Sequence, residues 1–516
     1  MPSPLEDVAV GERGMAAQTM MRKVLVANRG EIAVRIMRAC RELGIESVAV
    51  FSTADRLARH VLEADEACWI GEAASAQSYL RADALLEVAR ETGCDAVHPG
   101  YGFLSERAFF AEAVHAAGLV FIGPPAAAIR AMGDKTEARR RMLEAGVAVV
   151  PGTTAPLASA DDALDAAGAI GYPVMLKAAA GGGGKGMRAV HAADELARAF
   201  ASASGEAMNA FGDGSIYLEK FLQRPRHIEI QVLADAHGRT LHLGERECSI
   251  QRRHQKMIEE APSPVLRADL RERMGEAAVA AAQAVGYVNA GTIEFLFQDD
   301  EFWFLEMNTR IQVEHPVTEL VTGLDLVQWQ LRIAAGEPLP FTQQDITMSG
   351  HAIECRITSE DVFAGFLPST GRIERIDLPG GPGVRWDGAL AAGNDVSLWY
   401  DPLLGKLITW APDRRSAIGR MRRALDELCI IGVDTSVAFL RRVMDEPDFL
   451  AGDLDIRYIG RHPQLLEPDA DEETLRMVAL AAALTEEEMR ARRIVRRAGR
   501  PAPQASSGWR SLGWRA

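Results

Sequence analysis

Cysteine is scarce in this sequence, and none of it is spaced for a metal or redox centre. The 516 residues contain six cysteines, and no two of them form a CxxC motif. A zinc knuckle or a dithiol redox pair is therefore not predicted. We interpret the cysteines as core residues of a reduced, cytosolic protein, because persistent disulfides belong to oxidising compartments. They are Cys40, Cys68, Cys94, Cys248, Cys355 and Cys429.

Long apolar runs and an excess of positive charge are also absent. No stretch reaches the roughly 18 uncharged apolar residues that a membrane-spanning helix needs. The 72 acidic and 57 basic residues give a net charge of −15, which disfavours a nucleic acid or an anionic membrane as partner. Residues 1–20 carry Glu6, Asp7 and Glu12 without an apolar segment. We expect them to be a disordered extension rather than a targeting peptide.

What the sequence does contain is a regular alternation of strand-like and helix-like segments near its start. Residues 22–28 are predicted to form a buried strand, and Ile32, Ile36 and Leu43 follow at helical spacing. Further alternation continues to about Lys135. This βαβ pattern predicts a parallel sheet.

The remaining chain is predicted to form α+β units. Residues 152–225, with a strand at 174–178, have the pattern of a small mobile lid. Residues 226–335 carry long strands, one long helix and a hairpin, and residues 349–465 form a further unit. The last part, 466–516, holds one helix and a Pro/Ser/Gly stretch. At about 100–200 residues per domain, the length also indicates about three domains.

A glycine run follows the predicted strand that ends at Lys177. Residues 181–184 are all glycine, and their backbone N–H groups can approach an anion closely. The run is not a Walker A motif, because Ala179 and Gly186 stand where that motif needs Gly and Ser or Thr. A flexible surface loop is the alternative. Lys177 at the strand end favours phosphate binding.

Two carboxylates are placed symmetrically in a predicted hairpin at 291–308. Glu294 and Glu306 lie at equal distances from position 300, and cross-strand partners point to the same face. Carboxylates that meet in an apolar segment suit a divalent cation such as Mg²⁺, with Asn308 as a third ligand. Two solvent-facing glutamates on a sheet edge are the alternative.

Two further groups carry charges suited to small anions. Arg310 and Glu314 directly follow the hairpin, so a guanidinium could bind a planar oxyanion and a carboxylate beside it could accept a proton. Residues 251–256 place three cations and His254 in a net-acidic chain. A surface ion pair and a solvated basic loop are the alternatives.

Together these segments resemble the ATP-grasp biotin carboxylases of acyl-CoA carboxylases, over about residues 21–465. The matching segments are 26–33, 98–106, 132–135, 177–186, 251–256, 306–316 and 354–357. The resemblance implies an α/β and α+β multidomain fold. Its parts would be an N-terminal parallel-sheet (pre-ATP-grasp) domain at 21–135, an ATP-grasp domain at 136–335, a C-terminal α+β domain at 349–465 and an extension at 466–516.

The resemblance also implies a role for each matching residue. The ATP-binding residues would be Lys135, Lys177, Gly183, Gly184, Glu219, Lys220, Phe221, Leu222, His227, Gln251, His254 and Glu294. Two Mg²⁺ or Mn²⁺ ions would be held by Glu294, Glu306 and Asn308. Bicarbonate would bind Lys256, Arg310, Gln312 and Val313, and biotin would bind Tyr101 and Arg356. Catalysis would fall to Lys256, Arg310, Glu314 as the base for bicarbonate, and Arg356 as the group that stabilises the biotin enolate.

One motif of longer relatives is missing from this chain. No Ala-Met-Lys-Met carrier sequence occurs, so biotin is expected on a separate biotin carboxyl carrier protein that also serves a carboxyltransferase. Free biotin as the substrate is the alternative. The resemblance implies a homodimer. The tail with Trp509 and Trp514 is interpreted either as a partner-docking segment or as the remnant of a linker. Ala180 and Lys185 stand where some relatives have Gly and Arg.

Two other functions remain open at this point. The chain could be another carboxyphosphate-forming ligase of the carbamoyl-phosphate type, which the segment around Arg356 disfavours. It could also be a non-catalytic assembly subunit, which the complete set of charged residues disfavours. The final acyl-CoA acceptor is not encoded in this sequence.

Overall fold

The computed structural model describes residues 21–153, 155–179, 186–468 and 472–497. The predicted N-terminal extension, Gly183 and Gly184, and the tail with Trp509 and Trp514 lie outside the described residues. The chain divides into one unit through Leu465 and a second unit from Leu466. Each unit is described separately.

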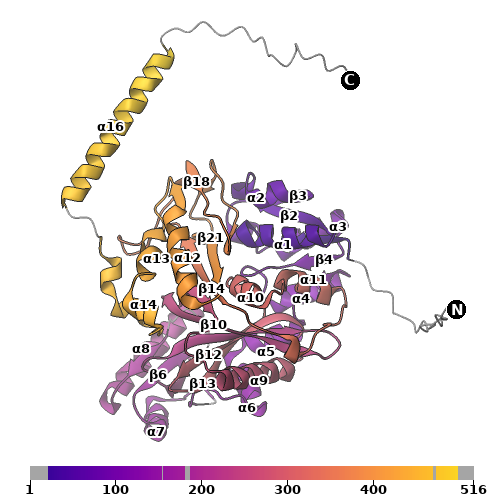
Figure 1. Ribbon diagram of the computed structural model, residues 1–516. Helices are drawn as coiled ribbons and strands as arrows, with labels where there is room; N and C mark the ends of the chain where they lie inside the picture. Colours follow the sequence, from indigo (N-terminus) through magenta and orange to yellow (C-terminus); the bar gives the residue numbers. More distant parts are fainter. Residues whose placement is uncertain (1–20, 154, 180–185, 469–471, 498–516) are drawn as a thin grey trace, which may run out of the picture. The chain divides into compact units, whose positions relative to one another are not determined.

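A parallel sheet forms the N-terminal part of the first unit, as the βαβ pattern predicts (Figure 1). Its strand order is β3-β2-β1-β4-β5, and every neighbouring pair is parallel. The strands are β1 (Lys23–Val26), β2 (Glu46–Ser52), β3 (Glu66–Gly71), β4 (Ala96–His98) and β5 (Val120–Phe121). The helices are α1 (Gly30–Glu42), α2 (Arg59–Glu63), α3 (Ala82–Glu91), α4 (Ala108–Ala116) and α5 (Ala126–Gly133). Because helices cover a parallel sheet on both faces, β1 is almost wholly apolar.

The carboxyl ends of β1 and β4 bring two loops together. The amide nitrogen of Asn28, just after β1, donates hydrogen bonds to the carbonyls of Pro99 and Tyr101, both at 2.7 Å. Asn28 is buried. This contact fixes the loop that carries Tyr101 at the edge of the sheet where ligands of open α/β folds bind.

An eight-stranded antiparallel sheet forms the centre of the first unit. Its order is β13-β12-β9-β10-β11-β14-β21-β19. The strands are β9 (Arg226–Ala234), β10 (Thr240–Arg252), β11 (Gln255–Ala261), β12 (Asn289–Gln298), β13 (Glu301–Asn308), β14 (His351–Thr358), β19 (Val384–Gly388) and β21 (Leu403–Ala411). Strands from the predicted units 226–335 and 349–465 pair through β11 and β14, with Ile258 opposite Cys355. The two predicted units therefore share one continuous sheet.

Helices and short strand pairs complete the part of this unit that follows the lid. The helices are α9 (Ala268–Ala284), α10 (His315–Thr322), α11 (Leu326–Ala334), α12 (Arg414–Glu427), α13 (Val437–Val443), α14 (Pro447–Ala451) and α15 (Tyr458–Arg461). The strand pairs are β15 (Glu360–Asp361) with β16 (Leu367–Pro368), β17 (Gly371–Arg372) with β20 (Asp395–Val396), and β18 (Arg375–Asp377) with β22 (Cys429–Ile431). Helix α9 packs on β9 and β10 around the buried side chains of Leu270, Met274 and Ile230.

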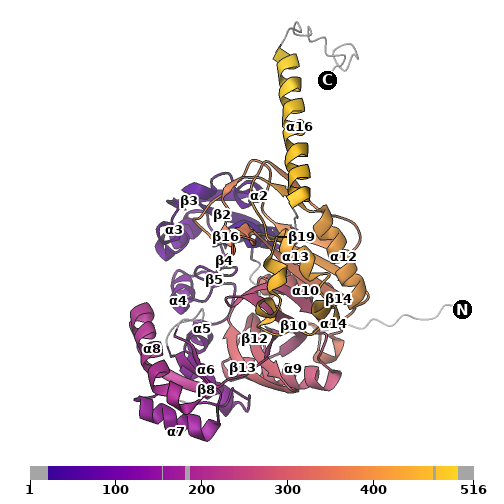
Figure 2. The same cartoon turned by 90° about the vertical axis from the view of Figure 1, so that its left-hand side faces the viewer.

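The helices and strands of the predicted lid segment lie together (Figure 2). They pack around a hydrophobic cluster of their own. It holds a three-stranded sheet of β6 (Val174–Ala178), β7 (Arg188–Val190) and β8 (Ile216–Lys220), with helices α7 (Ala160–Ile170) and α8 (Ala193–Phe211). Helix α6 (Lys135–Glu144) precedes it. Leu176, Leu196 and Leu218 are fully buried in this cluster. A separate core would let the segment move as one body. The movement of the lid itself stays a prediction.

The second unit contains the helix α16 (Glu472–Arg497), as predicted. No helix in the described ranges is long and apolar enough to cross a membrane. The interpretation of the cysteines as core residues holds for four of the six, but Cys68 and Cys429 are only half-buried. Cys68 lies on β3, an edge strand, and Cys429 lies on β22 of a two-stranded sheet, so neither strand is covered on all sides.

Candidate active site

A cavity of about 810 Å³ is lined by the Tyr101 loop, the lid, the eight-stranded sheet and residues 401–403. Most of the predicted site residues meet there. Those on its wall are Tyr101, Lys135, Lys177, Glu219, His227, Gln251, His254, Lys256, Glu294, Glu306, Asn308, Arg310, Gln312, Val313 and Arg356. Residues separated by more than 250 positions in the chain thus share one cavity.

Three predicted ATP-binding residues do not line the cavity with their side chains. The Lys220 ammonium donates to the carbonyls of Gly171 at 2.8 Å and Tyr172 at 3.1 Å, within the lid. The Phe221 ring packs against Arg457, and Leu222 is also absent from the cavity wall.

The two predicted metal carboxylates are cross-strand partners in the hairpin of β12 and β13. Its turn residues Asp299 and Asp300 both have positive φ, 55° and 62°, as a two-residue hairpin turn requires. That turn alone would place Glu294 opposite residue 305. A bulge between Glu294 and Phe295 shifts the register by one residue and places Glu294 opposite Glu306. The symmetry seen in the sequence therefore depends on this bulge.

The two carboxylates have different environments. Burial would raise the pKa of Glu294, but Lys256 and His227 hold that pKa below its usual value. The pKa of Glu306 is raised by desolvation and then by the negative charge of Glu294. An added cation would relieve this repulsion, and carboxylate oxygens suit Mg²⁺. The donor set therefore fits a divalent cation, although the Asn308 side-chain oxygen accepts a hydrogen bond from Arg310 at 3.1 Å.

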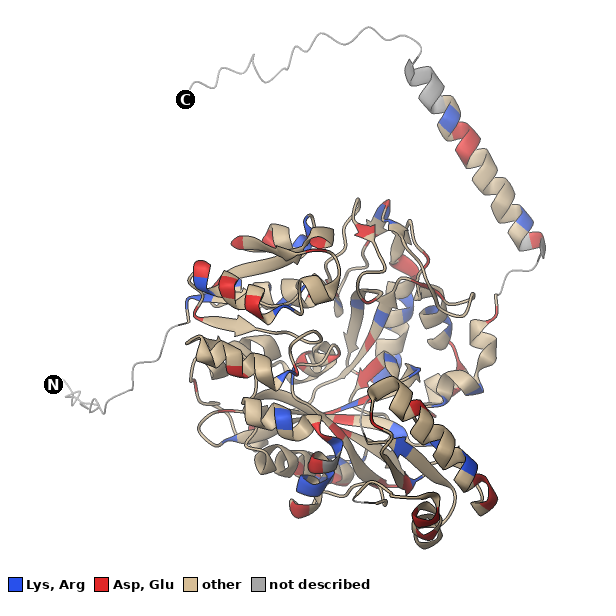
Figure 3. Ribbon diagram, turned by 180° about the vertical axis from the view of Figure 1, so that it is seen from behind, with Lys and Arg blue, Asp and Glu red and all other residues tan. Residues whose placement is uncertain are grey.

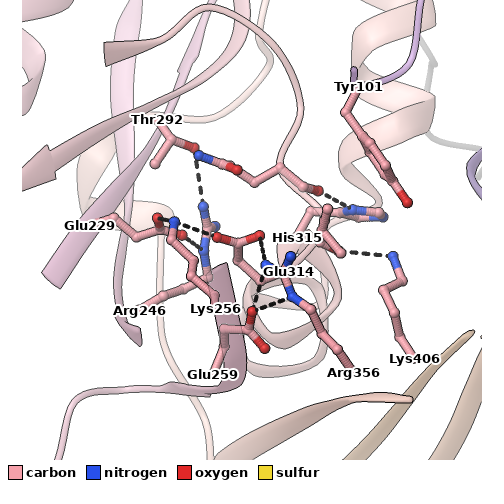
Figure 4. A network of polar contacts seen from close by, with 12 residues as sticks. Tyr101, Glu229, Arg246, Lys256, Glu259, Thr292, Glu314, His315, Arg356 and Lys406 are labelled. Carbon is pink, nitrogen blue, oxygen red and sulfur yellow. Dashed lines mark hydrogen bonds and ion pairs between the residues drawn. The ribbon is translucent and has the colours of Figure 1, made fainter. Parts of the chain in front are cut away.

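Lys256 is the centre of a buried charge network (Figure 4). Its ammonium donates to Glu294 at 2.8 Å, to Glu314 at 2.6 Å and to Glu229. Arg356 contacts the same Glu314 carboxylate at 2.9 Å. Burial alone would raise the pKa of Glu314, but Lys256 and Arg356 hold that pKa well below its usual value. Two cations therefore lie beside the Glu314 carboxylate and favour its ionised form.

The expected proximity of Arg310 and Glu314 is not seen as a direct contact. The Arg310 guanidinium pairs with Glu106 at 3.1 Å and donates to Gln312 at 3.0 Å. Glu314 instead faces Lys256, because it is the N-cap of α10 and the chain turns before that helix. Glu314 does not line the cavity itself but lies behind Lys256 and Arg356.

Sequence reasoning missed the residues that support this network. Arg246 is fully buried and donates to Glu229, to Gln231 at 2.7 Å and to Thr292 at 3.1 Å. Glu259 accepts from Arg356 at 2.6 Å. A signal was present: Glu229 and Gln231 alternate with apolar residues in β9, so one face of that strand is polar although the strand is central. Buried polar groups are almost always hydrogen-bonded, so such a polar face in a central strand predicts a network of partners.

The phosphate end of the cavity lies near the lid. Lys177 and Arg139 both form ion pairs with Glu219. Gln251 and His254 stand at the hairpin of β10 and β11, where His254 has a φ of 65°. Desolvation, and then the charges of His227 and Lys177, lower the pKa of His254. The positive charge that a phosphate-bearing substrate needs in a net-acidic protein is therefore supplied here by Lys135, Arg139 and Lys177, whereas the lowered pKa of His254 favours its neutral form. Elsewhere, Figure 3 shows acidic and basic residues interspersed over the surface elements.

Comparisons with known proteins agree with this site. The family model for the biotin carboxylase N-terminal domain matches residues 20–129. The model for the carbamoyl-phosphate synthase L chain ATP binding domain matches residues 134–342, and the biotin carboxylase C-terminal domain model matches residues 354–461.

Individual relatives are similar over most of their length. A pyruvate carboxylase subunit of Methanothermobacter thermautotrophicus is 54% identical over 443 residues, 86% of this chain and 90% of that protein. The biotin carboxylase of a Nostoc species is 55% identical over 438 residues, 85% of this chain and 98% of that protein.

A solved structure shows the same fold. It is the biotin carboxylase domain of the Hydrogenobacter thermophilus 2-oxoglutarate carboxylase in complex with MgADP, ADP and bicarbonate. That domain is 48% identical, covers 88% of this chain and 100% of its own, and superposes with a TM-score of 0.83. With three matching domain models in order, relatives above 50% identity and the charged cavity described above, this chain belongs to the biotin carboxylase family.

Proposed function

We propose that the chain catalyses the ATP-dependent carboxylation of biotin by bicarbonate, through carboxyphosphate. The observation that carries this proposal is the position of Glu314 between Lys256 and Arg356. Lys256 and Arg356 line the cavity in front of Glu314. Lys177 and the carboxylates Glu294 and Glu306 line the same cavity, and Glu294 also contacts Lys256. The Glu314 side therefore suits a small oxyanion, and the lid side with Lys177 suits a nucleotide phosphate.

The first chemical step would take place at the Glu314 end. Bicarbonate would compete with Glu314 for the cations of Lys256 and Arg356, which would free the carboxylate and raise its basicity. Glu314 would then remove the bicarbonate proton, an effect of roughly 10²–10⁴-fold. The bicarbonate oxygen would attack the γ-phosphorus, the bond to ADP would break, and Lys177 and Lys135 would neutralise the charge that develops on the phosphate oxygens.

Glu294 and Glu306, with the Asn308 oxygen, are the residues that would hold Mg²⁺. When bound, the cation supplies charge neutralisation and orientation of the phosphate oxygens. The raised pKa of Glu306 supports this assignment, because desolvation and the negative charge of Glu294 both disfavour an ionised Glu306 unless a cation is nearby.

The second step would transfer the carboxyl group to biotin. Carboxyphosphate would split into CO₂ and phosphate, and the phosphate would accept the proton of the biotin ureido nitrogen. That nitrogen would then attack CO₂, while Arg356 stabilises the enolate oxygen. Closure of the lid would exclude water, which would otherwise hydrolyse the intermediate.

The carboxyl acceptor beyond biotin is a further proposal. We infer that biotin is presented on a separate biotin carboxyl carrier protein, and that a carboxyltransferase subunit then uses it to carboxylate an acyl-CoA. The similarity to a protein named as part of a pyruvate carboxylase makes pyruvate the second candidate acceptor. A cytoplasmic location and a homodimer complete this proposal.

The two alternative functions have less support. A carbamoyl-phosphate-type ligase would share the ATP-binding domain model, but the biotin carboxylase C-terminal model covers the segment that carries Arg356. A non-catalytic assembly subunit would not need the buried network around Lys256.

The test measures which substrates the purified protein requires for turnover and which product it forms. ATP hydrolysis should require bicarbonate and Mg²⁺, should be stimulated by free biotin, and should fix labelled bicarbonate into biotin. Rates that are independent of both bicarbonate and biotin would contradict the proposal, and turnover that depends on ammonia would favour the carbamoyl-phosphate-type reaction.

A further inference from the structure

A fully buried lysine, Lys406, lies beside the bicarbonate end of the cavity without lining it. Its ammonium donates to the carbonyl of Val313 at 2.8 Å. It also pairs with the Glu31 carboxylate at 3.1 Å and lies 4.0 Å from Asp387. A charged group is expensive to bury unless it is paired and hydrogen-bonded. The position of Lys406 is therefore set by these partners.

The register of the large sheet explains why Lys406 points toward the site. On β14, β21 and β19, the residues Arg356, Lys406 and Asp387 are direct cross-strand neighbours. Neighbours in such a row point to the same face of the sheet. Lys406 therefore stands next to the arginine that we propose for the biotin enolate.

Glu31 extends this contact to the biotin side of the cavity. Its carboxylate accepts a hydrogen bond from the hydroxyl group of Tyr101 and pairs with Lys406. Figure 4 shows Tyr101 and Lys406 reaching the same region from opposite sides. Burial raises the pKa of Glu31, and the charge of Lys406 opposes that shift.

These contacts join three segments that are far apart in the sequence. Val313 and Glu314 are consecutive, so the carbonyl that Lys406 holds belongs to the peptide group whose nitrogen is that of Glu314. Tyr101 lies on the loop after β4 and Glu31 on α1. One ammonium group thus fixes the backbone next to the proposed base and, through Glu31, the ring that we propose lines the biotin pocket.

We propose that Lys406 is a positioning residue that holds the bicarbonate-binding backbone at Val313 and the biotin-pocket residue Tyr101 in register with each other. The inference rests on the proposed function, because it assigns both substrates of that reaction to the two sides of Lys406. Lys406 touches neither substrate and acts through Val313 and through Glu31.

The first test is Lys406→Met, which removes the ammonium and keeps most of the side-chain length. The Michaelis constant for bicarbonate should rise about tenfold in bicarbonate-dependent ATP hydrolysis, because a hydrogen bond from a charged donor is lost. The constant for free biotin should rise as well. The constant for MgATP should stay within twofold, because Lys406 has no contact with Lys177 or with any other described residue of the lid.

The second test is Glu31→Gln, which keeps Lys406 on Val313 but weakens the link to Tyr101. The constant for biotin should rise, and the constant for bicarbonate should stay near the wild-type value. This variant also decides the question if Lys406→Met does not fold, because an unchanged biotin constant in Glu31→Gln would overturn the inference.

Thr409→Val is the matched control. Thr409 lies on the same strand, is fully buried and donates to the carbonyl of Ala417 at 3.2 Å. Its side chain packs toward α12, on the other face of the sheet. This variant should lower the melting temperature and leave the three Michaelis constants unchanged.

The outcomes separate the inference from the proposed function. Equal rises of all three constants in Lys406→Met, or a lower turnover number with unchanged constants, would mean that Lys406 is only structural and would overturn the inference. Absence of biotin-stimulated turnover in the wild-type protein would overturn the proposed function, and the inference with it.

Discussion

The ammonium of Lys256 lies 2.6 Å from Glu314, and the same ammonium lies 2.8 Å from Glu294. One cation therefore links the carboxylate proposed to act on bicarbonate with a carboxylate proposed to hold magnesium. Lys256 is mostly buried, so these contacts are weakly screened by water. The proposed base and the proposed metal ligand are thus both stabilised by the positive charge of Lys256. Substitutions at either carboxylate test what that charge contributes to each role.

Glu314→Gln is expected to lower bicarbonate-dependent ATP hydrolysis by about 10²-fold or more, because the amide cannot accept the bicarbonate proton. The Michaelis constant for MgATP should change little. Steady-state kinetics with varied bicarbonate checks this. Wild-type turnover in the variant would remove Glu314 from the role of base. Glu486→Gln, on α16 and outside the first unit, is the control and should behave as the wild-type protein.

Glu306→Gln is expected to raise the Mg²⁺ concentration needed for half-maximal ATP hydrolysis by about tenfold or more, because one of the anionic oxygen ligands is lost. Chelation of Mg²⁺ should abolish the wild-type activity, and addition of Mg²⁺ should restore it. Binding of Mg²⁺ to the Glu306→Gln variant, measured by calorimetry with nucleotide present, gives a second readout. An unchanged Mg²⁺ requirement would argue that Glu306 is not a ligand.

Glu260 is expected to make stability depend on pH in the acidic range. Burial alone would raise its pKa, but Arg414 and His351 lower that pKa to about 2. Because the folded pKa lies below the ordinary value of 4.5, this carboxylate stabilises the fold above pH 4.5, and the contribution is lost as the pH falls toward 2. Its size at neutral pH is roughly 3 kcal/mol.

The Glu260→Gln variant should therefore melt at a lower temperature at pH 7, and the difference from wild type should shrink as the pH falls from 5 to 3. Thermal melts across this range measure it. Asp377→Asn is the control, because its partner Arg375 is largely exposed and such surface pairs contribute little. A constant difference at all pH values would contradict the assigned pKa.

Asn28→Ala is expected to loosen the Tyr101 loop. The substitution removes two buried hydrogen bonds to the carbonyls of Pro99 and Tyr101, and unsatisfied buried groups cost about 1–3 kcal/mol each. The melting temperature should fall, and the Michaelis constant for free biotin should rise more than that for MgATP. Equal changes of both constants would place the loop outside the biotin pocket.

Local patterns were enough to predict several elements of this fold. The strand predicted at 174–178 is β6 (Val174–Ala178), and the alternation near the start of the chain gives the parallel sheet. These elements are set by side-chain periodicity within about ten residues, which a sequence shows directly. The motif set also identified fifteen residues that line one cavity.

The sequence by itself thus determined the family, the order of the elements and the residue types of the site. Tertiary structure decided the features that depend on contacts between distant residues. One is the single sheet that joins 226–335 to 349–465. The others are the bulge that brings Glu294 opposite Glu306 and the contact of Glu314 with Lys256 instead of Arg310. Tertiary structure also decided that Lys406 meets Glu31 across 375 positions of the chain. Such contacts depend on strand register and on burial, and neither is visible in a local pattern, because a shift of one residue moves every side chain of a strand to the other face.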